Sequence, residues 1–153
     1  HKMFKAGADH NLAISFLMRP DDIPELDRMC GLYPETPVII DHLGGLEQAD
    51  GRFHDEQVDA LCGMARHKKV MLKVGAFQEL GFTDVLPLLR RVVDAFGPER
   101  CMWESDSGGT EFVDPERDYL ASIDVIRKHA DFLSASEKEQ ILFRTAEDFF
   151  FDR

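Results

Sequence analysis

The sequence has few cysteines, few basic residues and no long apolar run. The 153 residues include only three cysteines, Cys30, Cys62 and Cys101. They are too few and too scattered for a disulfide framework or a Cys-based zinc site. This cysteine usage indicates a reducing compartment, so we expect a cytoplasmic protein. The 18 basic residues against 29 acidic ones give a net charge of −11. An acidic chain is repelled by phosphate backbones, which argues against a nucleic-acid partner. No apolar run approaches the roughly 20 residues of a membrane span, which argues against a membrane partner.

The chain also lacks an initiator methionine and a glycine-rich loop after any apolar run. It opens on His1, in a pattern that predicts the middle of a helix. Without a glycine-rich loop, a dinucleotide or P-loop site is disfavoured. The composition that is present, 44% hydrophobic and 31% charged, is typical of a globular protein, and we treat residues 1–153 as one domain.

A unit of about 30 residues, an apolar run followed by a helical pattern, occurs four times along the chain. We predict strands over residues 12–18, 38–41, 70–74 and 100–103. We predict helices over about 22–33, from about 55, from a cap at Thr83, over about 119–130, and from a capping box formed by Ser134 and Glu137. Alternating strands and helices predict an α/β fold with a parallel sheet. Four units fit half of an eight-stranded barrel or a small open sheet, because a full barrel needs about 250 residues.

Polar side chains follow two of the predicted strands. His42 comes two residues after the run Val38–Ile40, and Asp106 comes three residues after the run 101–103. In α/β folds, catalytic groups gather at the carboxyl ends of the strands. The carboxylate could deprotonate water, the imidazole could polarise a carbonyl, and the pair could hold a metal. The structural alternatives are a solvated loop histidine and an aspartate that forms a turn or caps a helix.

Side chains alternate along a strand, so we predict which residues share a face. The expected inward sets are Val38, Ile40 and His42; Met71, Lys73 and Gly75; and Met102, Glu104 and Asp106. On these faces Lys73 and Glu104 should form an interior ion pair, because an unpaired buried charge is costly. An incomplete barrel should expose Val38, Ile40, Met71 and Met102 to water. We therefore expect self-association or a missing N-terminal half.

Four segments together carry a resemblance: "TPVIIDHLGG", "VMLKVGAF", "FGPERCMWESD" and "RTAEDFFFD". They resemble the amidohydrolase-related family of TIM-barrel hydrolases. The resemblance implies a partial (β/α)8 barrel, with strands five to eight, their helices and a C-terminal helix. It also implies that His42 and Asp106 are active-site residues of a hydrolase that acts on an ester, lactone or amide of a small carboxylated substrate.

The chain departs from the family pattern in two places. The family's His-x-His at the end of the first strand is absent, because the chain has no first strand. The fifth strand ends Leu17-Met18-Arg19-Pro20, without the metal-binding histidine of the decarboxylase branch. This resembles the lactonase branch, in which arginines hold substrate carboxylates, and Arg19 is placed to do so. No cofactor is predicted, but a divalent metal held by His42 and Asp106 stays open. The alternatives are a metal-dependent carboxy-lyase of the same fold and an inactive fragment with an assembly role.

Overall fold

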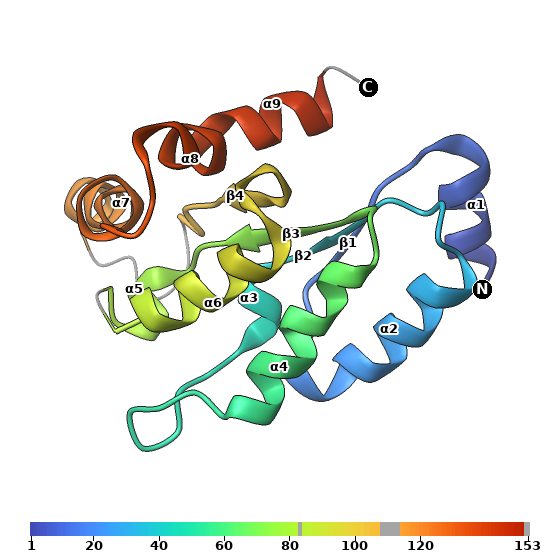
Figure 1. The fold of residues 1–153 in the computed structure, drawn as a ribbon, viewed down its shortest axis with the longest axis horizontal. Helices are drawn as coiled ribbons and strands as arrows, with labels where there is room; N and C mark the ends of the chain where they lie inside the picture. The colour runs from blue at the N-terminus through green and yellow to red at the C-terminus, as the bar shows by residue number, and fades with distance from the viewer. Residues whose placement is uncertain (83, 108–113, 152–153) are drawn as a thin grey trace. The chain divides into compact units, whose positions relative to one another are not determined.

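The computed structural model describes residues 1–82, 84–107 and 114–151, which form two compact units, His1–Lys73 and Val74–Arg153. In the first unit the elements are α1 (Lys2–His10), β1 (Ile14–Phe16), η1 (Pro20–Asp22), α2 (Ile23–Leu32), β2 (Val38–Ile40), α3 (His42–Gly45), α4 (Asp55–Gly63), η2 (Met64–Arg66) and β3 (Val70–Val74), whose last residue belongs to the second unit (Figure 1). The remaining elements are α5 (Phe77–Leu80), α6 (Leu86–Phe96), η3 (Pro98–Arg100), β4 (Cys101–Trp103), α7 (Pro115–Asp124), η4 (Val125–His129), α8 (Ala135–Glu139), η5 (Gln140–Arg144) and α9 (Thr145–Phe150).

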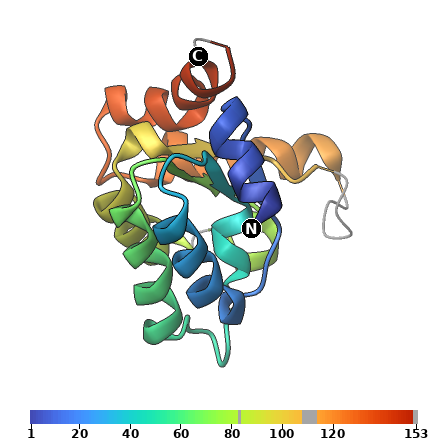
Figure 2. The same cartoon turned by 90° about the vertical axis from the view of Figure 1, so that its right-hand side faces the viewer.

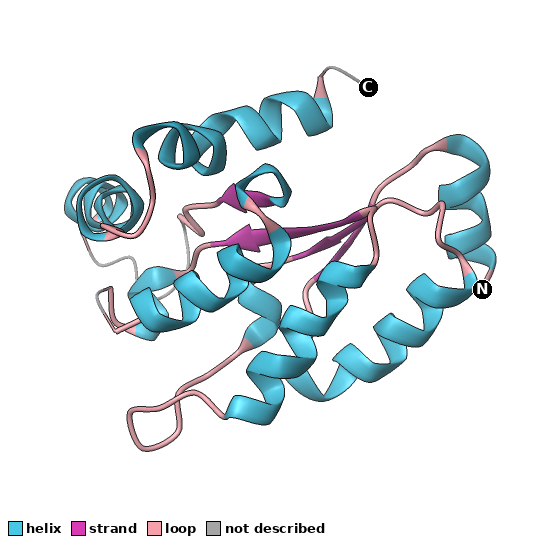
Figure 3. Cartoon of the chain, in the orientation of Figure 1, coloured by secondary structure: helices cyan, strands magenta, loops and turns pink. Residues whose placement is uncertain are grey.

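Short strands alternate with helices along the chain, as Figure 3 shows by colour. The strand order is β1-β2-β3-β4, and both β1–β2 and β2–β3 pair in parallel. The register places Ile14 opposite Val38, and Val38 opposite Val70. The predicted α/β class is confirmed. The first strand is shorter than predicted, because only Ile14–Phe16 pairs with β2.

Helices α2 and α4 contact each other in the first unit, and Figure 2 shows them running side by side. Their side chains meet β2 around Gly44. A Cβ built on Gly44 would lie 3.1 Å from Leu61 of α4, 3.5 Å from Ile23 of α2 and 3.7 Å from Ile40 of β2. Ile40 therefore points toward the helices rather than inward.

This geometry corrects the predicted faces of the second strand. Residues paired in register point to the same side of a sheet. Ile39 pairs with Met71, so by alternation Asp41 shares the face of Lys73, whereas Ile40 lies on the opposite face. The prediction failed because all three residues of β2 are apolar and buried. A run that is apolar throughout carries no alternation from which the faces could be assigned.

The predicted exposure of four apolar residues is also wrong. Val38 and Ile40 are 0% exposed, Met71 is 7% exposed and Met102 is 2% exposed. Ile40 lies near Gly44, where Leu61 of α4 and Ile23 of α2 also approach. In the second unit, η5 and α9 contact β4. Because these four side chains are buried, they give no reason to expect self-association.

The helices of the second unit differ from the prediction at their starts. The predicted cap, Thr83, lies outside the described residues, and α6 begins at Leu86. Helix α7 begins at Pro115, earlier than predicted, because the Asp114 side chain accepts a hydrogen bond from the Arg117 N–H. The short helix α5 was not predicted.

The predicted capping box of the last helix is confirmed. The Ser134 N–H donates to the Glu137 carboxylate at 2.7 Å, and the Glu137 N–H donates to the Ser134 hydroxyl at 3.3 Å. Hydrogen bonds from the Ser134 side chain and backbone hold the pKa of Glu137 below its ordinary value of 4.5. This reciprocal pair fixes where the C-terminal helical segment begins.

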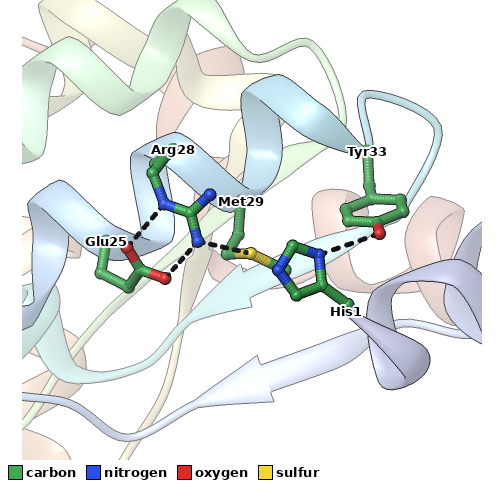
Figure 4. Close-up of polar contacts among 5 residues, drawn as sticks. All are labelled: His1, Glu25, Arg28, Met29 and Tyr33. Atoms are coloured by element: carbon green, nitrogen blue, oxygen red, sulfur yellow. Dashed lines mark hydrogen bonds and ion pairs between the residues drawn. The ribbon is translucent and has the colours of Figure 1, made fainter.

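Surface contacts of α2 are drawn in Figure 4. Arg28 donates two hydrogen bonds to Glu25, at 2.8 and 2.7 Å. Hydrogen bonding with Arg28 lowers the pKa of the Glu25 carboxyl. The His1 ring lies 3.1 Å from the Tyr33 hydroxyl.

The Cys30 thiol is buried in the first unit. Burial raises the pKa of this thiol to about 11, so the thiol stays protonated and unreactive near neutral pH. Within the described ranges, no helix is both long and apolar enough to span a membrane.

Candidate functional site

Left-handed backbone conformations follow three of the strands. His42 has φ 49°, Ala76 has φ 53° and Asp106 has φ 50°; they follow β2, β3 and β4 by two or three residues. Non-glycine residues rarely adopt this conformation, and histidine, aspartate and asparagine are the types that tolerate it best. Such residues cluster at functional sites, where the surrounding structure holds them in place. Both predicted catalytic residues therefore occupy special backbone positions.

The loop that carries His42 is built against the end of β1. The Asp41 N–H donates to the Phe16 carbonyl at 3.0 Å. A Cβ on Gly45, which has φ 67°, would lie only 2.2 Å from the Met18 carbonyl oxygen. The loop after β2 and the residues after β1 therefore lie against each other. The Nδ1 atom of His42 is buried.

A polar network that was not predicted lies beside His42. Asp41 accepts hydrogen bonds from the Ser15 hydroxyl at 2.9 and 2.8 Å and forms an ion pair with Lys73 at 2.8 Å. The register explains the pair: Ile40 lies opposite Leu72, so the next residues along each strand, Asp41 and Lys73, are neighbours. Asp41 was missed as a partner of Lys73 although it was placed in the predicted strand, because its position opposite Lys73 becomes visible only once the strand register is known.

Removal of Lys73 should destabilise the first unit. The side chains of Lys73 and Asp41 are 28% and 14% exposed, so Lys73→Met leaves a mostly buried carboxylate without this cation. We expect the free energy of unfolding to fall by about 2 kcal/mol, below the full effect of a completely buried pair because both groups retain some contact with water. Denaturant titration measures the change.

The matched control for this prediction is the ion pair Lys5–Asp9 on α1, whose side chains are 68% and 50% exposed. Lys5→Met should change stability by less than about 0.5 kcal/mol. Adding Asp41→Asn to Lys73→Met should recover part of the loss, because the carboxylate is then gone. Equal effects of Lys73→Met and Lys5→Met would contradict a stabilising role for the Asp41–Lys73 pair.

Arg19, the predicted substrate-binding residue, lies three residues after the end of β1 and next to the His42 loop. Its Cα is 3.6 Å from the Cβ position of Gly45. Its side chain is 84% exposed and forms an ion pair with Asp22, with Nε and Oδ2 3.7 Å apart. An exposed pair of this kind is weak, so a substrate carboxylate can replace Asp22 as the partner of the guanidinium at little energetic cost.

Asp106 lies in the second unit, where the ends of β3 and β4 approach closely. The Glu104 N–H donates to the Val74 carbonyl at 3.3 Å. A Cβ on Gly75 would lie 2.3 Å from the Glu104 carbonyl oxygen and 2.4 Å from its Cγ. The two strand exits are therefore in contact at Gly75 and Glu104, a contact that was not predicted. Of the loop after Asp106, the Ser107 N–H donates to the Ser105 hydroxyl, while Gly108 and Gly109 lie outside the described residues.

The side of β4 opposite to Glu104 is fixed by α7. The Trp103 indole N–H donates to the Ser122 hydroxyl at 3.2 Å, and its ring meets the Tyr119 ring edge-on at 5.5 Å. By alternation, Met102 and Glu104 point away from this contact. Packing of Trp103 therefore anchors the strand immediately before the loop of Asp106.

Two predicted pairings span both units, whose relative placement is not described. The convergence of His42 with Asp106 and the ion pair of Lys73 with Glu104 stay predictions. Among the described residues, no group of three or more histidine, cysteine, aspartate or glutamate side chains could hold a metal ion.

Comparison with known proteins identifies relatives. The chain is 35% identical over 102 residues to L-fucono-1,5-lactonase of Burkholderia ambifaria, a match to 63% of this chain and 35% of that protein. It is 33% identical over 98 residues to 2-pyrone-4,6-dicarboxylate hydrolase of Comamonas testosteroni, covering 56% of this chain and 32% of that protein.

A solved structure of a probable 2-pyrone-4,6-dicarboxylic acid hydrolase from Acinetobacter baumannii, with citric acid bound, superposes with a TM-score of 0.78. At 20% identity, this likeness shows the fold alone: the match covers 97% of this chain and 56% of that one. The chain thus corresponds to about half of a TIM-barrel chain, as the resemblance implied. The amidohydrolase family model, Amidohydro_2, matches residues 1–151, and the chain therefore belongs to this family.

Proposed function

We propose that the chain supplies the C-terminal half of a hydrolase that opens an ester, lactone or amide of a small carboxylated substrate. Asp106 acts as the general base for water, and His42 polarises the carbonyl that the water attacks. The observation that carries the proposal is the left-handed backbone at both residues, which follow strands of an amidohydrolase-family chain by two and three residues. The two curated relatives are named as a lactonase and a hydrolase, which supports the reaction class.

The division of roles follows from the chemistry of the two side chains. A carboxylate can take a proton from water, and the hydroxide that forms attacks the carbonyl carbon. An imidazole N–H can donate to the carbonyl oxygen as negative charge develops there. Lys73 holds Asp41 beside His42 and so helps to fix the loop from which the imidazole acts. Arg19 binds a substrate carboxylate at the end of β1.

The proposal includes a partner. The chain covers only about half of the structures it resembles, and β1 ends the strand order. An end strand offers unpaired backbone groups that can pair with a further strand. Leu12 and Leu17, on either side of β1, are 60% and 76% exposed. We propose that this edge pairs with an N-terminal half that completes the barrel, or with a second copy of the chain when that half is absent.

The test is an assay of the chain alone and mixed with the N-terminal half of the Burkholderia ambifaria lactonase. The substrates are L-fucono-1,5-lactone and 2-pyrone-4,6-dicarboxylate, and acid release is followed with a pH indicator. We expect turnover in the mixture and none from the chain alone, because the site is incomplete without the other strands.

Each other outcome has a distinct meaning. Turnover by a monomeric chain alone would contradict the half-barrel proposal. Release of carbon dioxide would identify a carboxy-lyase. A mixed complex that forms in a sizing column but hydrolyses neither substrate would favour an assembly role without catalysis.

A further inference from the structure

The side-chain amide of Gln78 stands out among the buried polar groups of the second unit. Its Nε2 and Oε1 atoms are both buried, and neither has a hydrogen-bond partner in the part of the chain that the structure describes. Buried polar groups without partners are rare, since each loses its bonds to water and gains none in return. Such a group calls for an explanation, and a missing ligand is one that experiments can test.

Gln78 lies at the edge of the sheet where Asp106 lies. It is in α5, which begins three residues after the end of β3, and Gly75 and Ala76 connect the two elements. Gly75 abuts Glu104, two residues before Asp106. Helix α5 also contacts α7, the helix that follows the Asp106 loop. The carboxamide therefore belongs to the loop adjacent to that of the proposed general base, within the same unit.

We propose that Gln78 binds the substrate, and that the group it binds is a hydroxyl-bearing part of the substrate ring. The inference rests on the proposed function, since it places the ligand in the hydrolase site. A carboxamide donates through Nε2 and accepts through Oε1. Both atoms are unsatisfied, so the ligand must also donate and accept. Adjacent hydroxyls on a lactone ring do both, whereas a carboxylate accepts only and would leave Oε1 without a donor.

This assignment gives Gln78 a different task from Arg19. An exposed guanidinium suits a carboxylate, and a buried neutral amide suits a neutral polar group. A site built to hydrogen-bond a hydroxyl discriminates strongly against analogues that lack it, because the amide then stays buried and unpaired. Gln78 thus determines specificity for hydroxylated lactones over unsubstituted ones.

The test compares Gln78→Met with Gln140→Met on the 153-residue chain. Methionine has a similar volume and no hydrogen-bonding requirement. The control, Gln140, donates from its amide to the Thr145 hydroxyl at 3.1 Å. If the Gln78 amide awaits a ligand, Gln78→Met raises Tm by about 2 to 4 °C, whereas Gln140→Met leaves Tm unchanged or lowers it. A lower Tm for Gln78→Met would show that a protein group or a buried water already satisfies the amide, and would overturn the proposal.

Binding is measured by calorimetry with two unreactive lactams. D-glucono-1,5-lactam carries ring hydroxyls, and δ-valerolactam has the same ring without them. The wild-type chain should bind the hydroxylated lactam more tightly, and Gln78→Met should weaken that binding about tenfold without affecting δ-valerolactam. Equal affinity of the wild type for both lactams, no binding of either, or no effect of Gln78→Met would overturn the proposal. Gln78-dependent binding without turnover in the lactonase mixture would instead leave this proposal standing and contradict the proposed function.

Discussion

Asp106→Asn is expected to lower lactone turnover by the completed barrel about 10³-fold, because an amide cannot accept the proton of the attacking water. Asparagine is the appropriate substitute here. Asp106 has φ 50°, and asparagine tolerates this left-handed backbone as well as aspartate does, whereas alanine would add strain. The loss should therefore reflect chemistry and not misfolding. Turnover is followed by acid release in the mixture of the two halves.

Two further measurements make this result specific. Asp94→Asn makes the same charge change at an exposed position of α6 in the same unit, and it should leave turnover unchanged. The residual rate of Asp106→Asn should rise with pH, because hydroxide can replace the water that the carboxylate would have deprotonated. Wild-type turnover by Asp106→Asn, or an equal loss with Asp94→Asn, would remove Asp106 from the mechanism.

Gly45→Ala should be the most destabilising single-methyl change in the first unit. The new Cβ would lie 2.2 Å from the Met18 carbonyl oxygen, and the backbone has φ 67°. The positive φ alone costs about 1 to 2 kcal/mol, and the backbone clash adds about 1 to 3 kcal/mol. We expect the free energy of unfolding to fall by about 3 kcal/mol or more, as measured by denaturant titration.

The matched control is Gly51, which has φ 74° but no atom within 4 Å of its Cβ position. Gly51→Ala should therefore cost only about 1 kcal/mol, the contribution of the positive φ. The difference between the two variants isolates the contact between the His42 loop and the end of β1. If Gly45→Ala and Gly51→Ala were equally stable, the close approach of these loops would be contradicted.

The architecture was largely predictable from the sequence, because hydrophobic patterns and caps act locally. The strand Val70–Val74 and the capping box at Ser134 were predicted where the structure has them. The faces of β2 were assigned wrongly, since a strand buried on both sides lacks polar alternation. The start of α7 was missed because the Asp114 cap precedes the apolar pattern from which the helix was predicted.

The candidate site shows the same distinction between features that local sequence predicts and features that depend on packing. His42 and Asp106 were predicted as site residues from the sequence because each follows an apolar run at a strand exit, a position that the chain order alone determines. The partners of these loops depend on register and on contacts between distant segments. Asp41 meets Lys73 only because β2 and β3 pair in one particular register. Gln78 becomes notable only once packing has buried both atoms of its amide. The sequence by itself determined the alternating strands and helices and the chemical groups at the strand ends. Only the tertiary structure decided which of those groups are buried and which ones meet, because burial and pairing arise between segments far apart in the chain.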